Sequence, residues 1–209
     1  MNTRTAGREL AFLAIGQLSQ SSELSPDKMI LAATRTLRDF AKSHLKKVRK
    51  DITKLGDFFF HEELDQQADP QKELDWKNIQ DSVSRLETAA FEVQEALDLV
   101  ELLNQDDNAH RYASSLIQAY RANRESIDSM LAQTLESNKT ADGKSWSTER
   151  VLAVDRTVLK IAITELSFFK GAPAVVVIDE AMKLSEKYGT EESPKFVNGV
   201  LADFVKNVT

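Results

Sequence analysis

Residues 154–166 read VDRTVLKIAITEL and carry the clearest helical pattern in this chain of 209 residues. Apolar side chains recur there three or four residues apart, and the same spacing extends from Val151 to Phe169, just before Gly171. This spacing places them on one face of an α-helix, whereas the side chains of a strand alternate between two faces. The stretch therefore predicts a strongly apolar helix that ends near Gly171.

The chain after this stretch predicts two more helices. Pro173 suits a first helical position, because its missing N–H would be unpaired there. The three valines at 175–177 resemble a buried strand, but apolar side chains continue at helical spacing as far as Gly189, so a helix is favoured. Gly189 suits a left-handed C-cap. Ser193 and Pro194 then form a cap-and-proline start for a terminal helix.

The chain before residue 151 predicts further helices. Residues 5–20 fit a first amphipathic helix, residues 107–136 fit one continuous helix, and residues 138–147 fit a loop. The expected buried side chains of helix 107–136 are Tyr112, Leu116, Ile117, Tyr120, Ile127, Leu131 and Leu135.

Residues 26–104 predict two long helices that pack as an antiparallel hairpin. The first begins at Ser25-Pro26, and its apolar residues recur at Ile30, Ala33, Leu37, Ala41, Leu45, Val48, Ile52, Leu55 and Phe59. The second carries a heptad seam of Val83, Leu86, Ala90, Val93, Leu97 and Val100. A seam this short is more typical of packing within a domain than of an extended coiled coil.

The two hairpin helices differ in charge. Residues 35–54 hold eight basic and two acidic residues, and a helical projection gathers the basic stripe of Arg35, Arg38, Lys42, Lys46 and Arg49. Residues 61–107 hold fourteen acidic and three basic residues, a net charge of −11. The whole chain carries −6, so the remainder is net positive at +5. Total acidity argues weakly against nucleic-acid binding, but it belongs to this one segment.

The composition excludes several classes of protein. The chain has no cysteine, which excludes disulfides, thiolate metal sites and a cysteine nucleophile. Seven glycines and four prolines are too few for an all-β sandwich or a glycine-rich phosphate loop. The apolar runs are too short for a signal peptide or a membrane-spanning helix. We expect an all-α protein of the cytoplasm.

The sequence offers no candidate catalytic or metal site. His44, His61 and His110 lack metal-ligand spacing. A nucleophile elbow, a Walker loop and a dinucleotide-binding fingerprint are all missing from the sequence. We therefore predict no catalytic residue, no metal, no cofactor and no enzyme activity.

Three features are typical of a binding module. Arg4 and Arg8 lie one helical turn apart, where the start of the chain can approach phosphates. Lys195, Phe196 and Asn198 follow a helix start, and free amides, a cation, an amide and an aromatic ring together suit a phosphate and a base. Spacing alone instead favours a buried Phe196. The basic stripe is either a contact for RNA or another anion, or a solvated helix face, and the solvated face is favoured.

Three stretches of this chain resemble the NusB family of transcription antitermination factors. They are VDRTVLKIAITEL at 154–166, YGTEESPKFVNGVL at 188–201 and the opening GRELAFLAIGQL at 7–18. SPKFVNGVL is the most specific element among them. The resemblance covers about residues 3–20 and 107–206.

The resemblance implies an all-α fold of two small helical bundles set side by side. Residues 1–25 and 105–209 would form it, and residues 26–104 would be an inserted helical hairpin, since the family joins these parts by a much shorter segment. The resemblance also implies that the protein pairs with the ribosomal protein NusE and binds the boxA element of ribosomal RNA transcripts. With other Nus factors it would let RNA polymerase read through terminators.

The resemblance further implies site residues. Those expected to bind RNA are Arg4, Arg8, Glu192, Lys195, Phe196 and Asn198. Asp155 and Glu165 are expected on the face that meets NusE. This chain has fewer arginines at its start than the family, and Gly16 stands where the family's first helix commonly carries a partner-facing aromatic.

Two other hypotheses stay open at this stage. A NusB-like domain precedes the catalytic domain of some ribosomal RNA cytosine methyltransferases, but this chain has no pattern for a cofactor-binding sheet. A scaffold that acts through the charged hairpin alone would lose its function when residues 26–104 are deleted. The sequence leaves both a monomer and a homodimer open.

Overall fold

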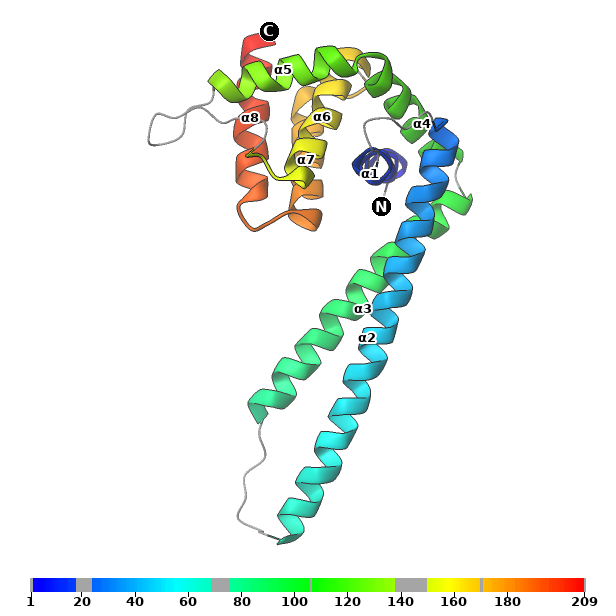
Figure 1. Cartoon of the computed structure of the whole chain (residues 1–209), viewed down its shortest axis with the longest axis vertical. Coiled ribbons are helices and arrows are strands. Elements are labelled where there is room, and N and C mark those ends of the chain that lie inside the picture. The colour runs from blue at the N-terminus through cyan, green and yellow to red at the C-terminus, as the bar shows by residue number, and fades with distance from the viewer. Residues whose placement is uncertain are drawn as a thin grey trace. The chain divides into compact units, whose positions relative to one another are not determined.

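The computed structural model describes residues 2–17, 24–68, 76–105, 107–137, 150–169 and 171–208. These residues form helices and short connections, with no strand among them, so the all-α prediction is confirmed (Figure 1). Contacts divide the chain into two units, Met1–Ala33 with Gln105–Thr209, and Thr34–Asn104. None of the described helices is both long and apolar enough to cross a membrane.

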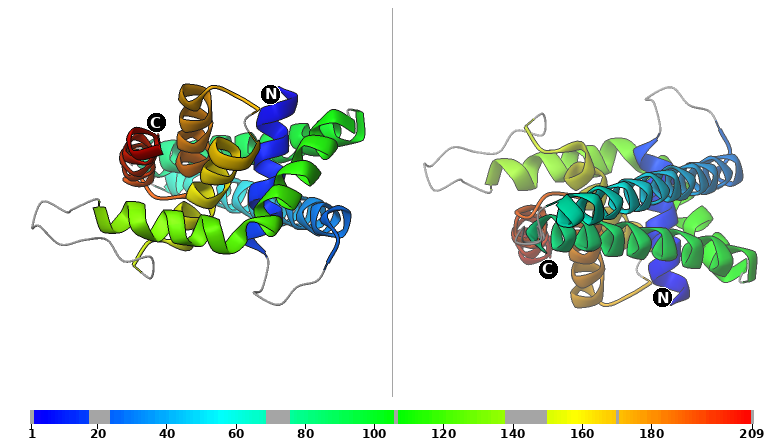
Figure 2. Two further views of the ribbon diagram at one scale, coloured as in Figure 1. Left: turned by 90° about the horizontal axis from the view of Figure 1, so that it is seen from above. Right: turned by 90° about the horizontal axis from the view of Figure 1, so that it is seen from below.

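The first unit is built around residues 154–166, the strongly apolar stretch VDRTVLKIAITEL. Its helices are α1 (Thr3–Gly16), the first turns of α2 (Pro26–Ala68), α4 (Asp107–Ala122), α5 (Arg124–Ser137), α6 (Ala153–Thr164), the π-helical turn η1 (Glu165–Phe169), α7 (Ala174–Tyr188) and α8 (Ser193–Val208). Helix α6 contacts α1, α4, α5, α7 and α8, and α1 also packs along α4 while α7 packs along α8 (Figure 2). The buried side chains of α6, which include Val158, Leu159, Ile161 and Ile163, supply the apolar surface for these contacts.

The prediction of one continuous helix over residues 107–136 is wrong, because the helix breaks at Asn123. The Asn123 backbone N–H donates to the carbonyl oxygens of Ala119 and Tyr120, and its side-chain amide donates to Ala119 O at 2.9 Å. The Asn123 carbonyl then accepts from Ile127 N–H as the next helix begins. An Asn side chain competes in this way for backbone groups and favours a break.

Gly189 ends α7, but it is not left-handed as predicted. Its backbone is extended, with φ −98° and ψ −154°. A Cβ atom at this position would lie 2.5 Å from both Ser185 O and Ser193 Oγ. Glycine is therefore required by the close approach of the chain rather than by a positive φ. The predicted helix over the valines 175–177 is confirmed.

The second unit is the pair formed by α2 from Thr34 onward and α3 (Trp76–Gln105), which lie side by side in Figures 1 and 2. His44 Nδ1 lies 2.6 Å from Glu92 Oε2, which fixes the level at which the two helices pair. Asp69 and Pro70 form a cap-and-proline pair that predicts the start of the second helix, and they lie outside the described residues, as does the predicted loop at 138–147.

The predicted seam of the hairpin is partly wrong, by one residue at alternate positions. On α3 the buried side chains are Ser82, Ala89, Val93 and Ala96, whereas Val83, Ala90 and Leu97 are exposed. On α2, His44, Asp51 and Phe58 are half-buried, whereas Leu45, Ile52 and Phe59 are exposed. Small side chains such as Ala89 and Ala96 let two helix axes approach closely. At Ser82, Ala96, His44 and Asp51, the prediction had selected the more apolar neighbour of the seam residue.

Candidate functional site

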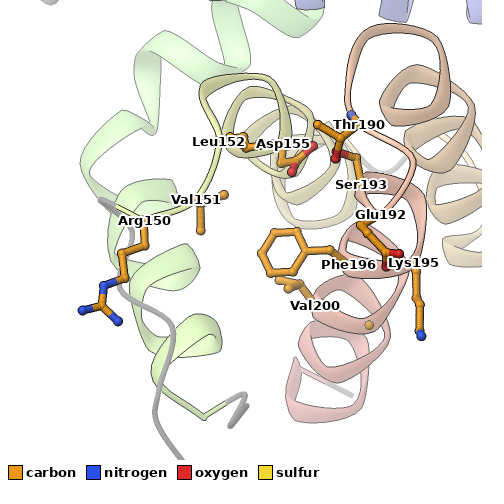
Figure 3. A pocket seen from close by; sticks show the side chains of 11 residues that line it. Arg150, Val151, Leu152, Asp155, Thr190, Glu192, Ser193, Lys195, Phe196 and Val200 are labelled. Atoms are coloured by element: carbon orange, nitrogen blue, oxygen red, sulfur yellow. Dashed lines mark hydrogen bonds between the residues drawn. The ribbon is translucent and has the colours of Figure 1, made fainter. Parts of the chain in front are cut away.

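A pocket of about 520 Å³ lies between the start of α6 and the start of α8 (Figure 3). Its lining residues are Arg150, Val151, Leu152, Asp155, Thr190, Glu192, Ser193, Lys195, Phe196, Gly199 and Val200. Four of the predicted site residues, Asp155, Glu192, Lys195 and Phe196, thus lie around one cavity although the first is far from the others in sequence.

Phe196 is half-buried, and its ring points into this pocket (Figure 3). The core-facing side chains of α8 are instead Val197, Val200, Leu201 and Phe204, which are fully buried. The alternative that Phe196 is simply a core residue is therefore wrong. Glu192 and Lys195 are exposed beside it, so one charge of each sign flanks an accessible aromatic ring.

Asp155 supplies a buried carboxylate to the pocket. The residue is only 4% exposed, and its Oδ1 has no hydrogen-bond partner among the described residues. It lies in the first turn of α6, where the helix dipole favours a negative charge. A buried acceptor without a donor costs free energy, so a ligand N–H placed here would be favoured. Asp155 was predicted on the face that meets NusE, and in the structure its side chain is buried at the pocket.

The turn before α8 sets the position of Phe196. Thr190 N–H donates to Ser193 Oγ at 2.9 Å, and Ser193 N–H donates to Thr190 O at 3.0 Å. Phe196 N–H donates to Glu192 O, which closes the first turn of the helix. This turn needs the glycine at 189, so the N-terminus of α8 is held rigidly beside the pocket.

Arg4 lies outside this pocket. Its side chain is exposed, and Nη1 donates to Gly171 O at 2.9 Å. Together with Thr3, Asn108, Arg111, Tyr112, Ser115 and Phe169 it lines a separate, shallower pocket. Arg4 and the neighbouring Arg111 give this second surface a positive charge.

Arg8 and Glu165 are buried, so the prediction that they contact RNA and NusE is wrong in its premise of exposure. Arg8 Nε donates to Glu165 Oε2 at 2.8 Å and Nη2 donates to Glu165 Oε1 at 2.5 Å. Tyr112 OH donates to the same Oε1 at 2.5 Å, and Glu180 Oε2 lies 3.4 Å from Arg8 Nη1. The bidentate pair ties α1 to the end of α6.

The cluster changes the titration of its members. Burial alone would lower the pKa of Arg8, but the hydrogen bond and negative charge of Glu165 outweigh burial and raise it. Burial, followed by the hydrogen bond to Glu165 and its charge, raises the pKa of Tyr112 well above its ordinary value. Arg8 therefore stays charged and Tyr112 neutral, as a structural role requires.

The structure adds residues to the site and leaves one outside it. Asn198 is exposed on α8 but does not line the pocket. Arg150, Thr190 and Ser193 line the pocket and were not predicted as site residues. The glycine and serine that bracket the turn were visible in the sequence, but no spacing pointed to Arg150. Among the described residues, no group of three or more His, Asp or Glu side chains is placed to hold a metal ion.

Comparisons with known proteins agree with this architecture. The model of the NusB family matches residues 75–206. This range includes α3, which the sequence analysis had assigned to an insertion. The transcription antitermination protein NusB of Gloeobacter violaceus is 29% identical over 100% of this chain and 96% of its own length. That of Synechococcus sp. is 30% identical over 96% of this chain and 92% of its own length.

These two relatives align with the whole length of the chain, so the residues of the hairpin are not peculiar to it. A crystal structure of the antitermination factors NusB and NusE in complex with dsRNA is 19% identical, covers 99% of this chain and 98% of its own, and superposes with a TM-score of 0.51. At that identity it shows the fold alone. By the family match and the full-length relatives, this chain belongs to the NusB family.

Proposed function

We propose that this protein is a transcription antitermination factor that binds boxA RNA of ribosomal RNA transcripts together with NusE. The proposal is supported by its family membership and by relatives named transcription antitermination protein NusB. The observation that carries it at residue level is the half-exposed Phe196 ring, which points into a pocket with a cation and carboxylates around it.

Each side chain of the pocket has a distinct part in this proposal. The Phe196 ring stacks on a base, which every base permits because every base has a π-face. Lys195 meets a backbone phosphate near the positive end of α8. Glu192 and Asp155 accept hydrogen bonds from the amino and imino groups of base edges, and edge contacts of this kind distinguish one base from another. Asn198 adds a polar contact on the exposed side of α8.

Arg4 extends the RNA path beyond the pocket. It is the one exposed member of the two arginines predicted at the start of the chain, and Arg111 lies beside it in the second pocket. Phosphate contacts fix the register of the RNA, while the pocket reads bases. Arg8 has no direct part, because its charge is used within the fold.

The partner surface of the proposal lies on α1 and the start of α6. Gly16 is exposed at the end of α1, and a Cβ atom there would meet Thr157 Cγ2 at 3.9 Å, an ordinary contact distance. A partner side chain can therefore approach this position closely. We propose that NusE contacts this surface and that RNA polymerase and other Nus factors complete the assembly in the cytoplasm. No bond is made or broken in this role, so the protein acts as a binding factor and not as an enzyme.

An in vitro transcription assay tests the proposed function. The template carries boxA upstream of a terminator, and purified RNA polymerase, NusE and the other Nus factors are supplied. Adding this protein is expected to increase read-through of the terminator, and a template with scrambled boxA is the matched control. Equal read-through on both templates would contradict the proposal.

A further inference from the structure

The hairpin carries an apolar surface that the proposed function does not use. Its residues are Leu45, Ile52 and Phe59 on α2, and Trp76, Val83, Ala90 and Leu97 on α3, called here the outer apolar face. The large side chains of this set are between 40% and 67% exposed. Water-exposed apolar side chains that recur in contiguous rows mark interaction surfaces rather than ordinary scatter.

The two rows of this face lie on the same side of the hairpin. Each α2 member directly follows a half-buried seam residue, as Leu45 follows His44, and each of Val83, Ala90 and Leu97 directly follows a buried one. All of them hold the same heptad position on their own helix. Reversing the direction of one helix keeps its seam residues facing the partner helix and moves each flanking row to the other side. Residues at equivalent heptad positions of two antiparallel helices therefore lie on the same side of the pair. The rows therefore form a single strip.

The pairing of His44 with Glu92 sets the heights along this strip. Because α2 and α3 run in opposite directions, a residue of α2 and a residue of α3 lie at the same height when their numbers add up to the same total as 44 and 92 do. Such residues are called level here. Ile52 is consequently within one residue of the level of Val83, and Phe59 is within one residue of the level of Trp76. Members of the two rows thus lie nearly side by side along the strip.

The two edges of the face carry different charges. Three residues before Leu45 and Ile52 lie Lys42 and Arg49, and Arg35 lies one heptad before Lys42 on the same edge, all three exposed. The corresponding edge of α3 carries the exposed residues Gln80, Glu87, Gln94 and Glu101. By the same level rule, Arg49 is level with Glu87, Lys42 with Gln94 and Arg35 with Glu101, on opposite edges.

We propose that this face binds a second copy of the chain, so that two hairpins form a four-helix bundle. A twofold axis parallel to the helices places α2 of one copy over α3 of the other and leaves every height unchanged. Apolar strip then meets apolar strip, and the basic edge of each copy meets the level acidic edge of its partner. The other face-to-face twofold arrangement places α2 over α2 and opposes two basic edges, which repel.

The size and charge of the face fit this occupant. From Arg35 to Phe59 the helix extends for about 36 Å at 1.5 Å per residue, and two adjacent helices are about 20 Å wide. Such a face gives on the order of 700 Å² per copy, close to the roughly 800 Å² of a standard interface. A polyanion such as RNA is disfavoured, because Glu87 and Glu101 border the strip along its whole α3 edge.

Charge reversal in the intact chain tests the proposal. Sedimentation velocity at concentrations from about 1 to about 100 µM measures the dimer, a range that covers moderate and weak self-association. Arg49→Glu or Glu87→Arg alone opposes like charges twice per dimer, and we expect the dissociation constant to rise about 10- to 100-fold. An equimolar mixture of the two variants restores both pairs, so it is expected to dimerise as the wild-type chain does.

The control is Lys47→Glu, an exposed basic residue on the other flank of α2, which is expected to leave the dimer unchanged. Circular dichroism checks that each variant keeps its helices. A wild-type chain that stays monomeric over the whole range would overturn the proposal, and so would a mixture of the two variants that fails to associate. Loss of boxA affinity in Arg49→Glu without any change in self-association would assign the face to RNA and also overturn it.

Discussion

At the scale of single residues, the site is defined by how side chains of one type differ in exposure. Arg4 and Arg8 are one turn apart, yet the first is exposed and the second is closed off by Glu165 and Glu180. Sequence spacing cannot separate them, because burial of Arg8 depends on acids more than 150 residues away along the chain. Phe196 and Val197 also differ in exposure, because consecutive residues point in different directions around α8. Phe196 is half-buried and Val197 is fully buried.

The first residue-scale prediction concerns Phe196. Replacing it by alanine in Phe196→Ala removes the stacking platform, which is worth about 1–3 kcal/mol per base, so boxA affinity should fall about 5- to 150-fold. Fluorescence anisotropy with labelled boxA RNA measures this. Phe168→Ala is the matched control, since Phe168 is an exposed aromatic on η1 outside the pocket, and it should leave affinity unchanged. Equal losses in both variants would refute the stacking role.

The second residue-scale prediction concerns Tyr112 at alkaline pH. Its folded-state pKa is raised above the ordinary 10.0, so the folded chain keeps a proton that the unfolded chain releases. The stability contributed by this group is complete below about pH 10 and is lost as pH rises above it, by up to about 1.4 kcal/mol per pH unit. Denaturant unfolding between pH 8 and pH 11 measures this trend.

Two variants separate Tyr112 from the other alkaline groups. Tyr112→Phe should be less stable near neutral pH, because Glu165 loses a donor, but its stability should fall less steeply above pH 10. Tyr120→Phe keeps Tyr112 and should retain the steep fall. An identical slope in all three chains would show that Tyr112 does not contribute to it.

At the scale of elements, most helices were predictable and their exact seams were not. The central stretch and the proline-led starts at 173 and 194 carry local signals, namely apolar period and caps, which act within one or two turns. The only local signal for the break at Asn123 is its side-chain amide, which donates to a backbone carbonyl oxygen. That signal is too weak to predict a break from the sequence. The hairpin seam depends on which side of each helix meets the other, since Ala89 is buried and Ala90 is exposed although their side chains are identical.

The candidate site was predictable only in part, for a related reason. Lys195, Phe196 and Asn198 follow a helix start, so local sequence gathers them, whereas Glu192 was predicted only through the family resemblance. Asp155 joins them because α6 and α8 pack together, which is a tertiary fact. Arg150 and Thr190 carry no spacing signal of their own. Arg8 was predicted to bind RNA from its spacing with Arg4 and from the family resemblance, and Glu165 was predicted to meet NusE from the resemblance alone, whereas the two neutralise each other inside the fold.

The element-scale prediction concerns the turn that sets α8. Gly189→Ala places a Cβ atom 2.5 Å from Ser185 O and Ser193 Oγ, so the turn must shift. We expect a loss of about 1–3 kcal/mol in unfolding free energy and weaker boxA binding, since the shift moves Phe196. Denaturant titration and RNA anisotropy measure the two effects.

The matched control for this prediction is Gly56→Ala, on an exposed stretch of α2. No atom lies within 4 Å of a Cβ built there, and alanine favours a helix over glycine by about 1 kcal/mol. This variant should therefore be slightly more stable than the wild-type chain. If Gly189→Ala were equally harmless, the close approach in the turn would not matter for the fold.

At the scale of the whole molecule, charge is distributed by segment rather than spread evenly. The total of −6 conceals an acidic segment of −11 over residues 61–107 and a net positive remainder. The residues proposed to meet RNA belong to that remainder, so total acidity gives no argument against RNA binding. The five residues of the basic stripe are all exposed, but they lie in the hairpin unit and not with the pocket.

The prediction at this scale separates local from overall charge. Lys46→Glu with Lys50→Glu changes the net charge by −4 but leaves the pocket intact, so the salt dependence of boxA affinity should be unchanged. Lys195→Glu changes it by only −2, yet it should weaken binding and make the dependence on salt shallower by about 0.7 per lost phosphate contact. Affinity measured at several salt concentrations checks both. A shallower slope in the first variant would make the basic stripe an RNA contact.

The central claim is that this protein, with NusE, recognises boxA RNA by sequence. Its most direct test is a titration of labelled boxA RNA and of a scrambled RNA of equal composition, with and without NusE, at one fixed salt concentration. We predict that boxA binds more tightly than the scrambled RNA and that NusE increases the difference. Equal affinity for the two RNAs in the presence of NusE would contradict the claim.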